Sequence, residues 1–291
     1  MIVVVQSIGQ IGNRLEQFSH LIAFARDHGV TIANPAFSLY SEFFEHTHRD
    51  LWCRHPSQSA SWVRKGLQRL CYYGLRLAAG LGLLRFVPGS VWIEAHWTSG
   101  AYDLANPQFI QLARAKKFVF LTGTWEHRYW KNYEAHIPAI QEHFQLTPEL
   151  RDRIARHLAP QRRSDEVLVG IHIRQGDFAS HQGGAYFFDA AAYAGVMRQV
   201  AKLFPEKPVV FLVCSNVPQE TGSFPGLRVF FGLGDFVCDL YSLAACDYII
   251  GPEISSFSGW ASLMGQKPRY GLSDPARTIA LADFVICKGL E

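Results

Sequence analysis

The chain has 291 residues, of which 48% are hydrophobic and 18% are charged, and its formal net charge is +3. This composition indicates a folded globular protein with one large or two modest domains and excludes a largely disordered chain. The charge is mild and the sequence contains no nucleic-acid-binding motif, so we expect no nucleic-acid partner.

The first half of the chain predicts alternating strands and helices. A strand over 2–5 leads through a turn that contains Gly9 and Gly12 into a helix over 13–27, whose apolar residues recur at the helical period. Met1 leads directly into this strand without a basic segment, so we expect no secretory signal and a cytoplasmic location. Further strands are predicted over 30–33, 91–95 and 117–122, and further helices over 107–115, 130–143 and 148–157.

Residues 51–93 contain six Lys or Arg residues and no Asp or Glu. They include a predicted helix whose apolar face consists of Val63, Leu67, Leu70, Gly74, Leu77, Leu81 and Leu84. We favour a core helix with a solvated basic back. The alternative is a basic amphipathic helix that makes peripheral contact with the inner face of an anionic membrane through 62–86. The arginines interrupt this segment too often for it to span a bilayer.

Aromatic residues follow the strand over 117–122, where a loop is well placed to contact a ligand. Sugars stack on aromatic faces, so Trp125 and Tyr129 are candidates for contacting a sugar, with core packing as the alternative for each ring, and Glu126 lies in the same loop. The segment 45–48, with His55 nearby, has the ligand spacing of neither a zincin nor a zinc finger. We expect a solvated loop there and no metal site.

A polar, proline-containing stretch over 157–165 predicts a division into domains over 1–160 and 161–291. The second half has the clearer alternation of strands and helices, which is typical of an α/β fold with a parallel sheet. Its predicted strands are 167–173, 208–214, 227–231 and 247–251, and its predicted helices are 189–203, 239–245 and 256–264.

The strand over 167–173 is nearly continuous in apolar residues, which suits a strand buried on both faces of a parallel sheet. His172 and Arg174 lie at its end, and Gly176 and Asp177 follow. Ligands of such sheets bind beyond the carboxyl ends of the strands, where a planar guanidinium can contact a phosphate at two points. The alternative is a surface Arg174 paired with Asp177 in an ordinary loop.

A second polar segment follows the strand over 247–251, where Ser255, Ser256 and Ser258 open a helix. Hydroxyls and free amides at a helix N-terminus favour an anion, although serine also serves as a simple helix cap. Two such segments on successive strand–helix units favour the binding of a phosphate-containing ligand.

Three segments together resemble a known family: the turn from Gly9 to Arg14, the stretch 172–178, and the segment 239–260. They are similar to the GT-B fucosyltransferases that use GDP-fucose, which include bacterial α-1,2 and α-1,6 enzymes and protein O-fucosyltransferases. The resemblance implies an α/β, GT-B-like fold of two Rossmann-type domains facing across a cleft. The domain over 1–160 would bind the acceptor, and the domain over 161–291 would bind the nucleotide sugar.

The resemblance also implies an activity: inverting transfer of fucose from GDP-fucose to a hydroxyl of a glycan, glycolipid or polysaccharide precursor, without a metal or other cofactor. Arg174 would hold the β-phosphate and stabilise the leaving diphosphate, with Asp239 near the guanine. The implied donor-binding residues are Gly12, Asn13, Gly176, Ser215, Asn216, Asp239, Ser255, Ser256, Phe257 and Ser258. The acceptor side would contain Trp125, Glu126 and Tyr129.

Glycosyl transfer places negative charge on the leaving phosphate, which suits Arg174. A carboxylate is expected to take the proton of the acceptor hydroxyl. Asp177 is the nearest candidate, Glu126 and Glu16 are others, and His172 could orient the base. A dissociative route with a weak base also remains open.

Two other functions are weighed against GDP-fucose transfer. Gln175 stands where bacterial relatives have a second Arg, and Asn216 stands where relatives often have an Asp, which favours a transferase for another nucleotide sugar. The other function is that of a catalytically silent carbohydrate-binding protein, because a fold by itself does not prove activity.

Overall fold

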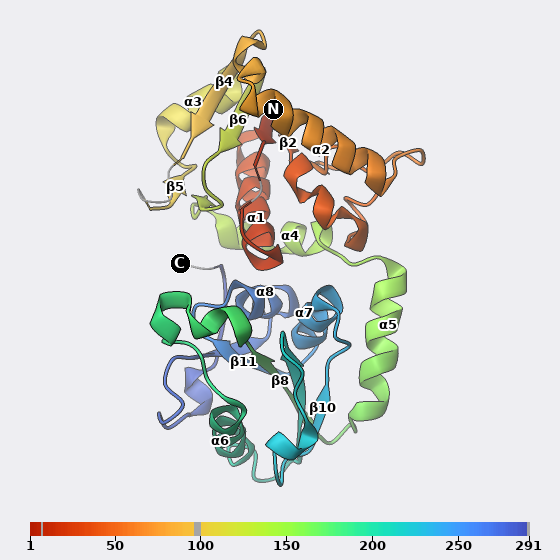
Figure 1. Ribbon diagram of the computed structural model, residues 1–291, viewed down its shortest axis with the longest axis vertical. Helices are drawn as coiled ribbons and strands as arrows, with labels where there is room; N and C mark the ends of the chain where they lie inside the picture. The colour runs from red at the N-terminus through yellow and green to blue at the C-terminus, as the bar shows by residue number, and fades with distance from the viewer. Residues whose placement is uncertain (7, 96–99, 290–291) are drawn as a thin grey trace. The chain divides into compact units, whose positions relative to one another are not determined.

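Figure 1 shows the computed structural model of the chain, which describes residues 1–6, 8–95 and 100–289. The chain divides into two compact units, Met1–Thr147 and Pro148–Glu291. The second unit begins with α5 (Pro148–Leu158), in which the Nε2 atom of His157 lies 2.9 Å from the carbonyl oxygen of Phe231. The division therefore differs from the predicted one after residue 160, because α5 packs within the second unit.

The first unit contains a five-stranded sheet and four helices. The strands are β1 (Ile2–Val4), β2 (Ile32–Ala33), β3 (Arg54–His55), β4 (Ser90–Glu94) and β6 (Phe118–Thr122). Their order is β3-β2-β1-β6-β4, and β3 is antiparallel to its neighbour while the others are parallel. A separate ladder pairs β5 (Tyr102–Asp103) with β7 (His127–Arg128). The helices are α1 (Ile11–His28), α2 (Lys65–Gly80), α3 (Pro107–Ala115) and α4 (Ile137–His143).

Helix α4 is shorter than the helix predicted over 130–143. Asn132 has a φ of 58°, in the left-handed region, and a 3-10 turn over Tyr133–His136 follows it. The α-helix starts at Ile137, with Pro138 in its first turn. Proline suits that position because it lacks the N–H that an interior helical residue donates.

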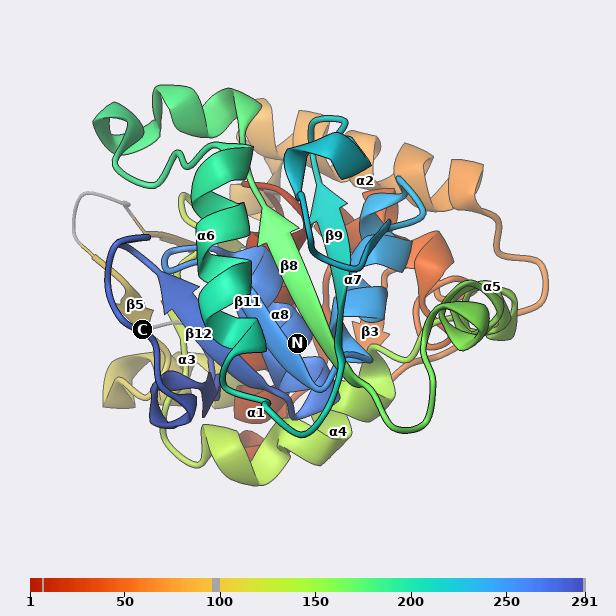
Figure 2. The same ribbon diagram turned by 90° about the horizontal axis from the view of Figure 1, so that it is seen from below.

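The second unit contains six strands in one sheet. They are β8 (Val167–Ile173), β9 (Val209–Ser215), β10 (Val229–Phe231), β11 (Tyr248–Pro252), β12 (Pro268–Leu272) and β13 (Val285–Ile286). β13 is antiparallel to β12, and the other pairs are parallel. Helix α6 (Ala190–Ala201) covers one face of this sheet, while α7 (Phe236–Ala244) and α8 (Ser256–Gly265) cover the other (Figure 2).

Alternation along β8 sorts its side chains between the two faces. Val169, Ile171 and Ile173 belong to the core that includes residues of α6. Gly170 faces α7, where a Cβ atom would lie 2.7 Å from a methyl carbon of Leu243. Glycine at this position therefore allows α7 to pack closely on the strand.

The strand order β10-β9-β8-β11-β12 reverses direction between β8 and β11. In such doubly wound sheets, ligands bind at this reversal, beyond the carboxyl ends of the two strands. The predicted α/β class is confirmed. Strand β12 was not predicted, because Pro268, Arg269 and Gly271 interrupt its apolar pattern.

The preferred prediction for α2 is wrong for most of the face expected in the core, although Val63 and Leu84 at the ends of that face are buried. Leu70, Leu77 and Leu81 are each 65–67% exposed, whereas Gln68 and Tyr72 are buried. The Gln68 amide accepts a hydrogen bond from Ser41 and donates two to backbone carbonyl oxygens. A buried amide with satisfied hydrogen bonds is well tolerated in a core. Among the described residues, no helix is both long and apolar enough to cross a membrane.

Candidate functional site

The carboxyl ends of β8 and β11 bring together two segments that are far apart in the sequence. The Nδ1 atom of His172, on β8, lies 3.2 Å from the Oγ atom of Ser255, which follows β11. The ring of Phe257 lies against that of His172, with 4.8 Å between centroids. A Cβ atom on Gly251 would lie 2.5 Å from the Ser258 hydroxyl, so glycine at this point leaves space for the loop to approach β8. The sequence-predicted segments therefore meet where the strand order reverses.

His172 is neutral at physiological pH. Burial lowers its pKa to about 3, and the positive charges of Arg174 and Arg269 contribute to the same shift. A base of such low pKa takes up a proton poorly near neutrality. The lowered pKa and the 3.2 Å contact with the Ser255 hydroxyl therefore favour an orienting role for His172 over proton transfer.

Arg174 is paired with Asp177. The Nη2 atom lies 2.6 Å from Oδ2 and the Nε atom 3.3 Å from Oδ1, and the guanidinium carbon lies 4.8 Å from the centroid of the Phe178 ring. The hydrogen bond from Arg174 lowers the pKa of Asp177. The ion pair considered from the sequence is thus present, and it makes the Asp177 carboxylate a weaker proton acceptor. A phosphate group offers oxygens that fit the same guanidinium edge.

Asn216 fastens the loop that follows Arg174 to the end of β9. Its Oδ1 atom accepts from the Gln175 N–H at 2.8 Å, and its Nδ2 atom donates to the Gln175 carbonyl oxygen at 2.9 Å. A carboxylate could accept the first bond but could not donate the second. Gly176 has a φ of 63°, and a Cβ atom there would lie 3.3 Å from the Asn216 Nδ2 atom. Asn therefore suits position 216 better than Asp, because its amide group makes both hydrogen bonds to Gln175.

We expect Asn216→Asp to lower the free energy of unfolding by about 1 kcal/mol, because one hydrogen bond is lost and two oxygens are brought together. Urea denaturation measures this change. Asn216→Ala removes both bonds and should cost at least as much. Equal stability of all three proteins would show that this two-point contact does not hold the loop.

Arg269 is a second guanidinium near the site that sequence reasoning missed, because β12 itself was not predicted. It is buried, and its Nε atom donates to the Ser258 hydroxyl at 3.0 Å. Its Nη2 atom donates to the carbonyl oxygens of Pro252 and Glu253. Within the part of the chain that the structure describes, no carboxylate lies within ion-pairing distance of it. Arg269 therefore adds an uncompensated positive charge beneath the loop after β11.

The serine-rich loop caps a helix, which is one of the two roles considered from the sequence. Ser255 caps α8, since its hydroxyl accepts from the Ser258 N–H at 3.4 Å, and both side chains are buried. Ser256 and Phe257 are half-buried in the first turn of α8. The positive end of the helix dipole lies at this turn, which favours an anion.

Asp239 and Ser215 support neighbouring loops. The Asp239 Oδ1 atom accepts from the Leu233 N–H at 2.6 Å, and burial raises the pKa of this carboxyl. A Cβ atom on Gly232 would lie 2.3 Å from the same oxygen. Asp239 thus holds the loop between β10 and α7, while the Ser215 hydroxyl accepts from the Val217 N–H.

In the first unit, the predicted donor-side turn is compact. Gly9 has a φ of 76°, and a Cβ atom there would lie 2.5 Å from the Asn13 Nδ2 atom. The Nε atom of Arg14 donates to the Gly9 carbonyl oxygen at 3.0 Å. Gly12 is buried in the first turn of α1, and Asn13 is half-buried beside it.

The predicted acceptor-side residues differ in exposure. Trp125 and Glu126 are half-buried, and the Arg128 guanidinium lies 4.5 Å from the centroid of the Trp125 ring. Tyr129 is buried instead, and its hydroxyl donates to the Asp27 carboxylate at 2.6 Å. Its ring therefore packs in the core rather than offering a face to a sugar.

Glu16, the other candidate base in this unit, is also buried. Its Oε1 atom lies 3.2 Å from the Nε2 atom of His20, which is itself buried. Both side chains are enclosed within the first unit, so Glu126 is the better exposed of the two alternative bases there.

Comparison with known proteins identifies the fold. No protein-family model and no curated protein matches the chain. The chain is similar to a solved structure of an Arabidopsis thaliana FUT1 mutant in complex with GDP, with 12% identity, a TM-score of 0.59, and coverage of 98% of this chain and 73% of that one. It is similar to the fucosyltransferase NodZ from Bradyrhizobium, with 17% identity, a TM-score of 0.58, and coverage of 95% and 96%. It is also similar to POFUT1 in complex with GDP, with 11% identity, a TM-score of 0.54, and coverage of 94% and 98%.

The chain has the same fold as these solved structures. The predicted GT-B-like class is thereby confirmed. TM-scores of 0.54–0.59 show the shared fold, whereas activity depends on the residues at the site.

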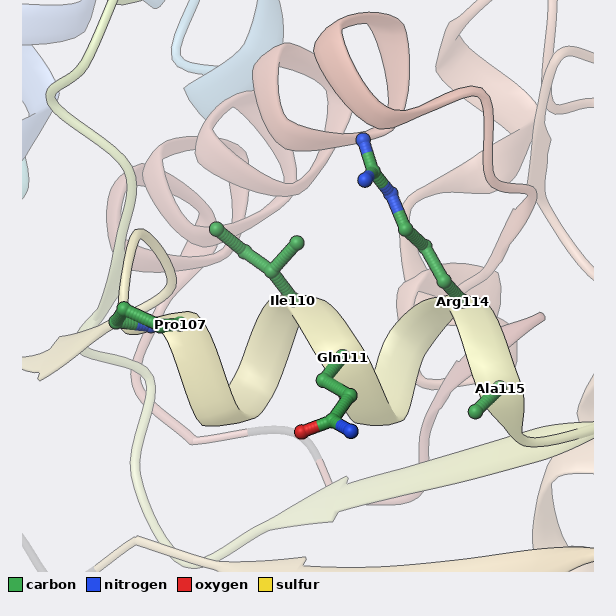
Figure 3. Close-up of a pocket in the computed structure, with 5 residues that line it drawn as sticks. All are labelled: Pro107, Ile110, Gln111, Arg114 and Ala115. Atoms are coloured by element: carbon green, nitrogen blue, oxygen red, sulfur yellow. The ribbon is translucent and has the colours of Figure 1, made fainter.

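Two surface hollows lie away from the predicted site residues. One, of about 500 Å³, is lined by Pro107, Ile110, Gln111, Arg114 and Ala115, all of which come from α3 (Figure 3). The other, of about 460 Å³, is lined in part by Val167 and Tyr248. These residues begin β8 and β11, so this hollow lies at the amino ends of the strands, opposite the predicted site. The described residues include no group of three His, Cys, Asp or Glu side chains arranged to hold a metal ion.

The predicted solvated loop over 45–48 is wrong, since part of it packs against the core. The His46 ring stacks on that of His143, and the Nδ1 atoms of His55 and His143 lie 3.4 Å apart. Burial lowers the pKa of His55 to about 4, and it lowers that of His127 to about 4 as well. These rings are neutral in the folded state at physiological pH.

The folded state of this chain should lose stability as pH falls from 6.5 towards 4. The unfolded state binds protons on His55, His127 and His172 in this range, while the folded state does not. Each such histidine contributes a slope of up to about 1.4 kcal/mol per pH unit. Urea denaturation at a series of pH values measures the free energy of unfolding. The variant His127→Gln should show a smaller dependence of this free energy on pH. A free energy of unfolding that stays constant over this range would contradict the expectation.

Proposed function

We propose that the chain is an inverting glycosyltransferase that transfers fucose from GDP-fucose to a glycan hydroxyl, without a metal or other cofactor. The observation that carries the proposal is the meeting of the Arg174 strand and the Ser255 loop at the reversal of strand order, 3.2 Å apart at His172 and Ser255. A guanidinium and a helix N-terminus at this position suit a diphosphate. The same fold occurs in solved structures that contain GDP.

In this proposal Arg174 stabilises the negative charge that develops on the leaving diphosphate. Arg269 and the first turn of α8 add positive potential to the same edge of the sheet. Asn216 and Gly176 hold the loop that carries Arg174. The donor phosphate displaces the Asp177 carboxylate from the Arg174 guanidinium. The displaced carboxylate is then free beside the reaction centre.

We also propose an acceptor and a cellular location for the enzyme. Trp125 and Glu126 belong to the acceptor side, and the acceptor is a glycan, glycolipid or polysaccharide precursor made in a bacterium. The enzyme acts in the cytoplasm and touches the inner face of the membrane through 62–86.

A carbohydrate-binding protein without activity is the second candidate, because Asp177 already occupies the Arg174 guanidinium. A panel of GDP, UDP, ADP and GDP-fucose, tested with EDTA by thermal denaturation, separates the candidates, since a ligand that binds the folded state raises its stability. We expect stabilisation by GDP and GDP-fucose and slow release of fucose from the donor. Stabilisation by UDP equal to that by GDP would favour another nucleotide sugar, and no shift with any nucleotide would overturn the proposal.

A further inference from the structure

Large apolar side chains are concentrated on one surface of the first unit. Seven of the thirteen exposed large hydrophobic residues in the described chain lie within 62–86. They are Trp62, Leu70, Tyr73, Leu77, Leu81, Leu83 and Phe86, which we call the α2 patch, and each is between 53% and 82% exposed. Single exposed apolar side chains are common, but a concentration of this kind marks an interaction surface.

Spacing along the helix explains why four residues of the patch lie together. Leu70, Tyr73, Leu77 and Leu81 are separated by three or four residues and therefore share one face of α2 and its end. Leu83 and Phe86 follow closely in the chain, in the 3-10 turn over Leu83–Phe86, and are also exposed. Figure 1 shows α2 along the outside of the first unit.

The apolar face of α2 is exposed because the opposite face, which carries Gln68 and Tyr72, is buried in the first unit. The Gln68 side chain makes three hydrogen bonds, to the Ser41 hydroxyl and to the carbonyl oxygens of Thr47 and Asp50, at 2.7–2.8 Å. Tyr72, one turn further along, is fully enclosed. Rotating α2 to bury its leucines would leave these buried polar groups without hydrogen-bond partners, which is unfavourable. The leucines are therefore held in solvent when nothing covers them.

The charge around the α2 patch is predominantly positive, and Glu42 compensates one of the five basic residues. Arg64, Arg76 and Arg85 are exposed, and Lys65, which pairs with Glu42, and Arg69 are half-buried. Residues 51–93 contain no Asp or Glu that could neutralise them locally. An apolar stripe bordered by basic side chains is the pattern of a helix that lies in the interface of an anionic membrane. A two-fold contact between copies of this chain would instead place the same basic residues opposite one another.

We propose that the α2 patch docks the protein on an anionic lipid bilayer. The side chains of Leu70, Leu77, Leu81 and Phe86 enter the boundary between headgroups and acyl chains, and the exposed arginines contact the phosphates of the headgroups. This inference does not depend on the nucleotide bound by the second unit. Combined with the proposed function, it places the enzyme where a lipid-linked acceptor is presented.

Co-sedimentation of the full chain with vesicles tests the proposal. We expect binding to vesicles of mixed phosphatidylcholine and phosphatidylglycerol, weakened by added salt, and at least tenfold weaker binding to phosphatidylcholine alone. The triple variant Leu77→Gln, Leu81→Gln, Phe86→Ser should lose at least tenfold in affinity for the anionic vesicles, and so should Arg76→Glu with Arg85→Glu. The matched control is Val285→Ser with Ile286→Ser, which removes exposed apolar side chains from the second unit and should leave binding unchanged.

Each variant must keep the thermal stability of the wild type and its response to GDP, which separates loss of docking from loss of folding or of the donor site. Equal binding to both kinds of vesicle, or binding that survives the triple variant, would overturn the proposal. Sedimentation velocity without vesicles provides the other decisive result. A wild-type dimer that the triple variant converts to a monomer would assign the patch to self-association instead.

Discussion

Arg174→Ala should lower the turnover of GDP-fucose by about 100- to 1,000-fold and remove the thermal stabilisation by GDP, because the leaving diphosphate loses a charged donor at the reversal of strand order. Arg174 is partly exposed on the loop after β8, so its removal should leave the fold intact. Turnover is measured by the release of GDP, and binding by the shift in melting temperature. A variant that keeps normal turnover would exclude Arg174 from the reaction.

Two companion variants separate the roles of Arg174 and Asp177. Arg174→Lys keeps the charge but loses the two-point geometry, so it should recover part of the binding. Asp177→Asn releases the guanidinium from its carboxylate partner, which lies 2.6 Å away. If Asp177 accepts the proton of the acceptor hydroxyl, this variant should bind GDP at least as tightly as the wild type while turnover falls. If both binding and turnover are retained, the base lies elsewhere, and Glu126 is the next candidate.

Arg269→Leu should lower the free energy of unfolding of the second unit by about 3 kcal/mol. The substitution leaves the Ser258 hydroxyl and the carbonyl oxygens of Pro252 and Glu253 without their shared donor in a buried position. The loop that carries Ser255 should also lose its position, so stabilisation by GDP should weaken. Urea denaturation with and without GDP measures both effects.

Arg277→Leu is the matched control for this variant. Arg277 lies in the same C-terminal segment, and its ion pair with Asp283 is exposed, so its loss should cost less than about 1 kcal/mol. Arg269→Lys keeps one donor and the charge and should restore part of the stability. If Arg269→Leu costs no more than the control, Arg269 does not anchor the loop after β11.

Local signals in the sequence predicted the framework of the second unit closely. The apolar run over 167–173 matches β8, and the serine-rich opening of α8 and the alternation of strands and helices were also predicted. These features depend on neighbouring residues: a strand buried on both faces needs a continuous apolar run, and a helix start needs a cap. Arg174 could be singled out for the same reason, because it follows such a strand directly.

Contacts between segments that are distant in the sequence decided the position of Arg269, the burial of Tyr129 and the buried face of α2. Local sequence patterns do not predict such contacts. Arg269 joins the site through β12, whose apolar pattern is interrupted, and Tyr129 is enclosed although it follows a predicted ligand-side loop. The clearest case is α2, where the apolar periodicity was read correctly but the buried face was not. Gln68 is buried because Ser41, Thr47 and Asp50 supply its hydrogen-bond partners. Periodicity shows that a helix has two faces, but the partners available across the tertiary structure decide which face is covered.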